Sequence, residues 1–304
     1  MFIISNNNSS FRAEEVISSG KFGHVWIGYD TNNSQKVIIK ETSQNHTILM
    51  DKLTKINHPV LQIGELAYSG ENVYLVRKYL SGSDIKTIIS KRRVWKKFDI
   101  SFWVNGFISL LNGLETLHKA GIVHRDIKPS NIIIEHDNKK VSEWNSLNFK
   151  IIDFEQSLII SSAETEERSP FSLGYAPPEQ LLNRNRLTGA WSDIFSLGIT
   201  LFEAISGNKA FSYHDPEMMM HIQLNLPITN NRKVDTELFE IIKKATQKQP
   251  FRLPPNRLTL DEIDMVIQSG IDKRYKSAHD LASDLKNWMT NNQSKGKRVW
   301  VKRL

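Results

Sequence analysis

His124-Arg125-Asp126-Ile127-Lys128-Pro129-Ser130-Asn131 is the stretch of this sequence that carries the strongest structural signal. A second short segment, Asp153-Phe154-Glu155, begins 27 residues after Asp126. Together the two segments supply carboxylates, an amide and a lysine at fixed spacing. Chance does not account for so long a run followed by an Asp-Phe pair at that distance. We therefore expect the two segments to meet at one site.

The two segments resemble the catalytic loop and the metal-binding loop of the protein kinases. The resemblance implies that Asp126 is the catalytic base and that Lys128 steadies the transferring phosphate, as in serine/threonine kinases. It also implies that Asn131 and Asp153 bind Mg²⁺, because one amide and one carboxylate plus phosphate oxygens satisfy this hard cation. Glu155 departs from the family, which has glycine there, and a side chain restricts the backbone motion of this loop.

The segment Ser18-Ser19-Gly20-Lys21-Phe22-Gly23-His24-Val25 is similar to the glycine-rich hairpin of the same family. Glycines allow backbone N–H groups to approach phosphates. The residues expected to bind ATP here are Ser18, Gly20, Gly23 and Val25. Ser18 replaces the first glycine of the family pattern. An ordinary tight hairpin has the same composition, but the following strand, which ends in a lysine, favours a nucleotide loop.

That strand, Val37-Ile38-Ile39-Lys40, resembles the one whose lysine contacts the α- and β-phosphates, which assigns this role to Lys40. Leu49 falls where a helix usually supplies a glutamate to pair with the lysine. Asp51 or Glu41 could take the place of this glutamate after a shift of the chain. Alternatively, Asp153 alone could hold Lys40. Ile38 stands where the family usually has alanine against the adenine, so its extra bulk is expected to tighten or tilt the base site.

The segment from Leu75 to Leu80 resembles the hinge whose backbone reads the adenine edge. Arg77 falls at a position that is usually apolar, and a buried cation there needs a partner. The resemblance also places Ile133 against the nucleotide. Asp84 is placed either to accept a hydrogen bond from the ribose or to cap the following helix, and both readings remain open.

The run Ser172-Leu173-Gly174-Tyr175-Ala176-Pro177-Pro178-Glu179 resembles the end of the activation segment. The Ser172 hydroxyl is expected to contact Asp126 and Lys128, and Glu179 is expected to pair with a buried arginine, for which Arg274 is the best candidate. Asp193 resembles the helix residue that holds the backbone of the catalytic loop. These last residues position the site without touching substrate.

Arg125 is neutralised in the family by a phosphorylated residue of the activation loop, and autophosphorylation is one source of that phosphate. The available hydroxyls are Ser161, Ser162, Thr165 and Ser169. A competing interpretation pairs Arg125 with native carboxylates and needs no phosphate. Those carboxylates belong to Glu164, Glu166 and Glu167.

The periodicity of the chain changes near Ser81-Gly82. Before it, strand-like runs occur at Val16-Ile17, Val25-Trp26-Ile27, Val37-Ile38-Ile39 and Val73 to Tyr79, with one helix containing Leu49, Leu53 and Ile56. After it, apolar residues at helical spacing predict helices around Phe107 to Leu117, Ile194 to Ile205 and Leu281 to Trp288. We expect an α+β, bilobal protein-kinase-like fold over about residues 12–290. It has a small antiparallel β-rich N-lobe with one main helix (about 12–80) and a larger, mainly α-helical C-lobe (about 81–290).

Two segments fall outside the family pattern. Residues 251–272 form an insertion where the family spans two or three residues. A short helix over Leu260 to Ile267 packed on the large lobe is one reading, and a docking site for a partner is the other. Residues 291–304 form a polar, basic tail that we expect to be poorly ordered.

Composition excludes several classes of protein. Zero cysteines rule out disulfides, thiolate metal sites and cysteine nucleophiles. No apolar stretch reaches the length of a membrane span and the N-terminus lacks a signal peptide, so we expect a cytoplasmic protein with no membrane partner. The net charge of +7 lies largely in Lys91 to Lys97 and the tail. Solvated helix ends explain it better than nucleic acid does.

The resemblance is closest to the bacterial eukaryotic-like serine/threonine protein kinases. It implies transfer of the ATP γ-phosphoryl group to a hydroxyl of a protein substrate, with ATP and Mg²⁺ as cofactors. The alternative is a pseudokinase that binds nucleotide or acts as a scaffold with little or no turnover. The departures that favour the alternative are Ser18, Ile38, Leu49 and Glu155. The residues that would touch metal, phosphate or hydroxyl are all present, namely Lys40, Asp126, Lys128, Asn131 and Asp153.

Overall fold

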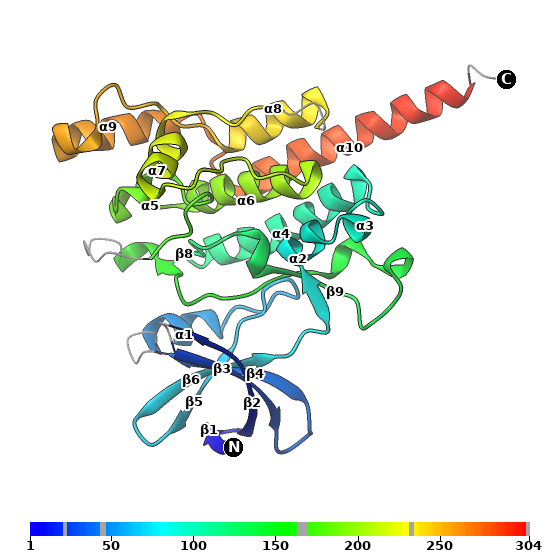
Figure 1. Cartoon of the computed structure of the whole chain (residues 1–304), viewed down its shortest axis with the longest axis vertical. Coiled ribbons are helices and arrows are strands. Elements are labelled where there is room, and N and C mark those ends of the chain that lie inside the picture. Colours follow the sequence, from blue (N-terminus) through cyan, green and yellow to red (C-terminus); the bar gives the residue numbers. More distant parts are fainter. Residues whose placement is uncertain (21–22, 43–46, 163–169, 231–233, 302–304) are drawn as a thin grey trace.

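The computed structural model describes residues 1–20, 23–42, 47–162, 170–230 and 234–301, with side chains described as far as residue 292. Figure 1 shows a β-barrel at one end of the molecule and stacked helices at the other. We call residues 1–80 the N-lobe and residues 81–301 the C-lobe. The predicted bilobal architecture is confirmed.

The N-lobe is a closed antiparallel barrel with strand order β1-β2-β3-β4-β6-β5. Its strands are β1 (Phe2–Ser5), β2 (Ser10–Gly20), β3 (Gly23–Asp30), β4 (Lys36–Thr42), β5 (Glu65–Ser69) and β6 (Asn72–Lys78). The apolar residues that fill it include Ile4, Phe11 and Ile39, each at most 2% exposed. β1 and β5 are not predicted from the sequence, because both strands are short.

Helix α1 (Thr47–Leu53) lies between β4 and β5 in the chain. It buries Leu49, Met50 and Leu53, as the helical spacing predicts. Ile56, which the same spacing assigned to the helix, lies beyond its end, because the chain leaves the helix in a turn where the Ile56 N–H bonds to the Leu53 carbonyl at 2.9 Å.

Short strands between the lobes hold the two loops that carry the sequence signal. They are β7 (Gly82–Asp84), β8 (Ile122–Val123), β9 (Ile132–Glu135), β10 (Phe149–Ile151) and β11 (Leu158–Ile159). The catalytic loop lies between β8 and β9, and Asp153 lies between β10 and β11. Because β9 pairs with β10 and β8 pairs with β11, the two loops are fixed side by side.

The C-lobe is mainly helical, as predicted. Its helices are α2 (Ile85–Ser90), α3 (Arg92–Trp95), α4 (Ile100–Lys119), α5 (Pro178–Leu181), α6 (Ala190–Ser206), α7 (Pro216–Asn225), α8 (Thr236–Ala245), α9 (Leu260–Ile271) and α10 (Ala278–Val301). The predicted apolar face of α4 is fully buried from Phe107 to Leu117, and α6 is buried on every side from Ser192 to Ser206. Fully burying each leucine or phenylalanine contributes about 1.5–3 kcal/mol.

Two C-lobe helices, α9 and α10, are longer than the sequence predicts. α9 covers the predicted 260–267 helix and packs Ile263, Ile267 and Ile271 in a small apolar cluster of its own. Asp264 of α9 accepts a 2.6 Å ion pair from Arg184, which lies after α5, so the helix is anchored on the C-lobe. α10 continues past Asn291 to Val301, projecting from the helical stack (Figure 1). The side chains of the 293–304 part of the predicted tail lie outside the described residues.

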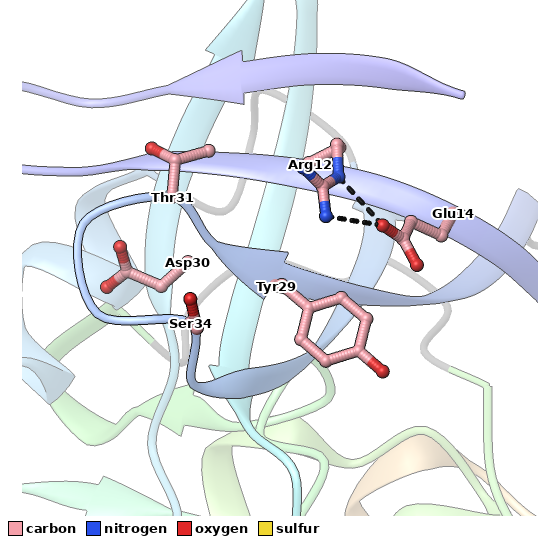
Figure 2. A pocket seen from close by; sticks show the side chains of 6 residues that line it. All are labelled: Arg12, Glu14, Tyr29, Asp30, Thr31 and Ser34. Atoms are coloured by element: carbon pink, nitrogen blue, oxygen red, sulfur yellow. Dashed lines mark hydrogen bonds and ion pairs between the residues drawn. The ribbon is translucent and has the colours of Figure 1, made fainter.

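A hollow in the N-lobe lies at the end of β3 that is opposite Gly23. Figure 2 shows its lining, and its cavity volume is about 310 Å³. The polar groups around it bond to one another: Arg12 pairs with Glu14 at 2.7 Å, and Asp30 accepts from the backbone of Asn32 at 2.8 Å. We assign no function to this hollow. Within the described part of the chain, no helix is both long and apolar enough to cross a membrane.

Candidate active site

Asp193 of α6 holds the backbone of the catalytic loop, as predicted. Its carboxylate is fully buried and accepts hydrogen bonds from the N–H groups of His124 and Arg125, each at 2.8 Å. A third bond, also 2.8 Å, comes from His118 Nε2. Burial alone would raise the pKa of Asp193, but its bonds to His118 and His124 outweigh this and lower the pKa. The loop is therefore fixed by a buried, ionised acceptor.

Asp126, Lys128 and Ser172 form a triangle of hydrogen bonds. Lys128 Nζ donates to Asp126 Oδ2 at 2.7 Å and to Ser172 Oγ at 2.8 Å, while Ser172 Oγ donates to Asp126 Oδ1 at 2.6 Å. The Asp126 side chain is 1% exposed and that of Lys128 is 23% exposed. The sequence predicts this set of contacts, and the structure brings all three residues together.

Asn131 is oriented by Asp126. Its Nδ2 donates to the Asp126 carbonyl at 2.9 Å and to Asp126 Oδ2 at 2.8 Å. This leaves the amide oxygen Oδ1 as the atom that could bind a cation. Within the described residues no group of three or more His, Asp or Glu side chains forms a preformed metal site. An amide and a carboxylate that await phosphate oxygens fit Mg²⁺, which keeps few protein ligands.

Asp153 adopts a left-handed backbone conformation, with φ of 68°. Its side chain remains one-third exposed. The next residue, Phe154, is buried and packs edge-on against the ring of His124, with ring centroids 4.7 Å apart. The apolar contact thus ties the Asp153 loop to the catalytic loop, and the positive φ falls on Asp153 instead of on Glu155, where the family has glycine.

Lys40 lies between two carboxylates. Its Nζ forms a short ion pair with Glu155 Oε2 and lies 3.4 Å from Asp153 Oδ1. Burial alone would lower the pKa of Lys40, but Asp153 and Glu155 together raise it above its ordinary value. Lys40 is therefore charged at neutral pH and is held by the loop that carries Asp153 and Glu155.

The residue that pairs most closely with Lys40, Glu155, is not among the predicted substitutes for the missing helix glutamate. Leu49 is buried, 7% exposed, as an apolar residue of the main core. Asp51 instead pairs with Lys55 at 2.8 Å, and the two side chains are each 70% exposed. Asp153 does contact Lys40, but not alone. The sequence analysis does not connect Glu155 with Lys40, although a carboxylate where the family has glycine is a visible signal.

The glycine hairpin joins β2 to β3, with Ser18 paired to Val25 and Gly20 paired to Gly23. Val25 is paired in turn to Lys40 on β4. Directly paired residues of antiparallel strands project from the same face. Ser18, Val25 and Lys40 therefore share one face of the barrel. Gly23 has φ of 97°, a conformation that glycine adopts without strain. Lys21 and Phe22 lie outside the described residues.

Arg77 and Ile38 are directly paired on β6 and β4, two residues from Lys40 on the same face. Ile38 is 8% exposed. Burial lowers the pKa of Arg77, and the negative charge of Asp153 partly offsets this. Arg77 Nη1 also donates to the Lys78 carbonyl at 3.4 Å. Asp153 is thus the charge that partly offsets the burial of this cation at a usually apolar position.

Asp84 caps helix α2, since its carboxylate accepts from the Thr87 N–H at 2.8 Å and from Thr87 Oγ1 at 2.7 Å. The capping reading of Asp84 is therefore correct, and a ribose contact stays a prediction. Asp84 is paired with Ile133 across β7 and β9, which places the half-buried Ile133 beside the chain that links the lobes.

Glu179 and Arg274 form the predicted buried ion pair. Arg274 Nη1 lies 2.7 Å from Glu179 Oε1, and both side chains are 0% exposed. Ser192 Oγ donates to the same carboxylate oxygen at 2.9 Å, and Arg274 Nε donates to the Gln247 carbonyl at 2.6 Å. This network ties the end of the activation segment to α6 and to the segment before α10.

Arg125 is 5% exposed and has φ of 68°. Burial lowers its pKa, with Asp193 partly opposing the effect. Its Nε has no hydrogen-bond partner among the described residues. Ser161 and Ser162 lie in a 3₁₀ turn after β11. The other predicted partners of Arg125, which are Glu164, Thr165, Glu166, Glu167 and Ser169, lie outside the described residues.

Comparison with known proteins agrees with this geometry. The Protein kinase domain model matches residues 11–266. The chain is 28% identical over 288 residues to CBL-interacting serine/threonine-protein kinase 21 of Arabidopsis thaliana, covering 90% of this chain and 64% of that protein. It is 24% identical over 307 residues to serine/threonine-protein kinase ULK3 of Xenopus laevis, covering 90% and 63% respectively.

A third relative is bacterial. Serine/threonine-protein kinase PrkC of Bacillus subtilis is 26% identical over 318 residues, covering 99% of this chain and 44% of that protein. The chain thus spans less than two thirds of the length of each of these three relatives. Because the family model matches most of its length, the chain belongs to the protein kinase family.

Proposed function

We propose that this chain transfers the γ-phosphoryl group of ATP to serine or threonine hydroxyls of proteins. The observation that carries the proposal is the triangle in which Lys128 Nζ bonds to both Asp126 and Ser172, at 2.7 and 2.8 Å. It couples a carboxylate to a cation at the point where an acceptor hydroxyl and a phosphate must meet. The names of the relatives, which are serine/threonine kinases, support the same acceptor class.

Asp126 serves as the base in this reaction. Its carboxylate is fixed by Asn131 and Lys128, so it is oriented before substrate arrives. The substrate hydroxyl oxygen forms a bond to the γ-phosphorus and the bond from that phosphorus to the β–γ bridging oxygen of ATP breaks. The hydroxyl proton passes to Asp126, and ADP leaves with the bonding electron pair.

Lys128 places positive charge beside Asp126, where the transferred phosphoryl group carries its negative charge. Ser172 keeps both residues in place through its hydroxyl. A serine/threonine kinase accepts short aliphatic hydroxyls, and the contacts of Ser172 with the base and the lysine are those that the resemblance assigns to this class. The acceptor specificity proposed here therefore rests on Lys128 and Ser172.

The residues that fit Mg²⁺ and nucleotide line the opposite side of the same site. Asn131 through Oδ1 and Asp153 through its carboxylate would hold the metal, which when bound spreads the charge of the phosphates. Lys40 would contact the α- and β-phosphates, and the backbone of the Gly20–Gly23 hairpin would cover them. The residues assigned to the base and ribose are Val25, Ile38, Asp84 and Ile133.

A second candidate function is a nucleotide-binding or scaffold module without turnover. The observation that favours it is the short contact of Lys40 with Glu155, which occupies a cation that nucleotide phosphates would otherwise approach. Against it, the catalytic triangle is complete and its members are buried or half-buried in place. We therefore favour the enzyme.

Incubation with Mg²⁺ and ATP labelled in the γ-phosphate tests the proposal. We expect label on serine or threonine of added protein or of the chain itself, and loss of that label in Asp126→Asn. Equal labelling by the wild type and Asp126→Asn contradicts the catalytic reading. A wild type that binds ADP in a thermal-shift assay but never transfers label supports the binding module. Intact-mass measurement of the purified chain shows whether it already carries phosphate.

A further inference from the structure

The closest carboxylate partner of Lys40 lies in the other lobe. Lys40 is on β4 of the N-lobe, whereas Glu155 follows β10 in the C-lobe, 115 residues later in the chain. The Glu155 side chain is only 15% exposed and that of Lys40 is 26% exposed. A half-buried carboxylate and ammonium in contact stabilise each other, because each would be costly to leave without an opposite charge.

Helix α1 offers no charge to Lys40 at the position where the family has a glutamate. Leu49 occupies that position and belongs to the same apolar cluster as Phe154 and Leu75. Asp51, the next acidic residue of α1, is directed to Lys55. The described contacts of α1 with the site are thus apolar, while the described ionic contacts of Lys40 come from the Asp153 loop.

We propose that Glu155 is the positioning residue for Lys40, in place of the glutamate that helix α1 lacks at Leu49. The assignment rests on the proposed function, since it takes Lys40 to be the cation that contacts nucleotide phosphates. Under this assignment, the missing glutamate at Leu49 and the missing glycine at Glu155 are two parts of one exchange. The carboxylate that pairs with Lys40 lies in the C-lobe and not on helix α1.

In the proposed function, Asp153 would have to serve both the metal and Lys40, and the exchange relieves it of the second role. Asp153 must serve the metal, and its distance to Lys40 of 3.4 Å is long for a charge-assisted hydrogen bond. Glu155 supplies a second carboxylate that remains on Lys40 when the metal draws on Asp153. The lysine ammonium has three N–H donors, so contacts with Glu155 and Asp153 leave one donor for a phosphate oxygen.

Because the pair joins the two lobes, the position of Lys40 depends on how closely the lobes approach. In an arrangement with a glutamate on α1, movement of that helix would break the pair. Here α1 can shift without changing the ionic contacts of Lys40. With Glu155 as the partner, the position of this cation follows the approach of the two lobes and not the position of α1.

A double-mutant cycle on nucleotide binding tests the assignment without requiring turnover. Dissociation constants for ADP with Mg²⁺ are measured by calorimetry for the wild type, Glu155→Gln, Lys40→Met and the double variant. We expect Glu155→Gln to weaken ADP binding about tenfold, and to change it less than twofold when Lys40 is already methionine. Asp51→Asn removes the same charge from α1 at an exposed site and is expected to leave ADP binding unchanged.

Three results overturn the assignment: ADP binding by Glu155→Gln equal to that of the wild type, equal losses in both Lys40 backgrounds, or tighter binding, which would identify Glu155 as a group that repels phosphate. A wild type that binds ADP but transfers no phosphate overturns the proposed function alone, and the cycle still decides the pairing. A wild type that binds no ADP overturns both.

Relocating the carboxylate gives a second, independent test. Glu155→Gly is expected to lose ADP affinity as Glu155→Gln does. Adding Leu49→Glu to Glu155→Gly restores the arrangement of the family, and we expect it to recover at least half of the lost affinity in a chain that melts cooperatively. If Leu49→Glu prevents folding, the double-mutant cycle remains decisive, because it leaves the core residue Leu49 unchanged.

Discussion

The N-lobe and C-lobe residues of the candidate site are held by different kinds of contact. On the C-lobe side, Asp193 and the Glu179–Arg274 pair are fully buried and fix the catalytic loop and the activation segment from within. On the N-lobe side, Lys40 is partly exposed and is held by a carboxylate from the opposite lobe. The proposed reacting groups are therefore positioned by the C-lobe core. The position of Lys40, the proposed phosphate-binding cation, depends instead on contact between the lobes.

The largest expected effect comes from breaking the buried C-lobe pair. Arg274→Met leaves Glu179 as an unpaired charge with 0% exposure, so the free energy of unfolding is expected to fall by about 3–5 kcal/mol. Urea denaturation followed by circular dichroism measures it. Lys243→Met removes an exposed cation that pairs with Glu240 at 3.2 Å and is expected to cost less than about 1 kcal/mol. Similar losses in the two variants contradict the distinction between buried and exposed pairs.

The separation of chemistry from positioning predicts different kinetics for the two lysines of the site. Lys128→Met is expected to lower kcat about 10²–10³-fold with little change in ADP affinity, because Lys128 acts at the transferred phosphoryl group. Lys40→Met is expected to weaken ADP binding as well. Steady-state kinetics with calorimetry measure both, and Lys140→Met, at an exposed position, serves as control. Loss of ADP affinity in Lys128→Met would contradict the separation.

Lys248 of the C-lobe is a buried lysine, in contrast to the partly exposed Lys40. Burial, with a contribution from Arg274, lowers the pKa of Lys248 to about 7, the opposite direction from Lys40. Between that value and the ordinary lysine pKa of about 10.4, the unfolded chain binds a proton that the folded chain does not. Stability therefore rises with pH across this window, and Lys248 contributes no pH dependence below it.

The rise is expected to reach about 2–3 kcal/mol between pH 7 and pH 9, at about 1.4 kcal/mol per pH unit. Chemical denaturation at a series of pH values measures it. Lys248→Met is expected to remove the rise, while loss of the bond to the Gln223 carbonyl contributes a cost that does not change with pH. A slope that persists in Lys248→Met would assign the pH dependence to another group.

The smallest expected effect concerns Asp84, where the lobes join. Asp84→Ala removes the cap of α2 and is expected to cost about 1 kcal/mol of stability, whereas Asp84→Asn keeps the cap and costs little. If Asp84 also accepts from the ribose, ADP binding weakens in Asp84→Ala. Thermal denaturation and calorimetry of both variants separate the two roles. Unchanged ADP affinity in both would leave Asp84 with the capping role only.

The sequence predicts the C-lobe side of the site well because its roles are encoded locally or by strong patterns. Asp126, Lys128 and Asn131 lie within one short run, and their geometry follows once that run is a loop between two strands. Asp193 and Arg274 were also assigned correctly, since each lies in a recognisable segment. The apolar faces of α4 and α6 follow from spacing alone.

The N-lobe side was harder to predict for a physical reason. The Lys40–Glu155 pair joins residues 115 positions apart, and nothing in the local sequence of β4 indicates which carboxylate will reach it. Asp153 is a candidate through the family resemblance and does contact Lys40, whereas Asp51 and Glu41 are candidates by nearness in sequence. Tertiary contact decided otherwise, because the buried position on α1 is held by Leu49 through apolar packing. β1 was missed because four residues carry too little pattern to identify a strand.

Closure of the N-lobe barrel by β1 limits how other proteins can bind there. A sheet edge presents unpaired N–H and C=O groups, which act as a template for a strand from another chain. Here β1 pairs with β2 along its length and meets β5 at Ser5 and Tyr68. Ser5 and Tyr68 are the one residue pair described between β1 and β5, so closure blocks strand addition at this point of the seam. β1 also covers the edge of β2 from Ser10 to Ala13, which protects that stretch against edge-to-edge aggregation.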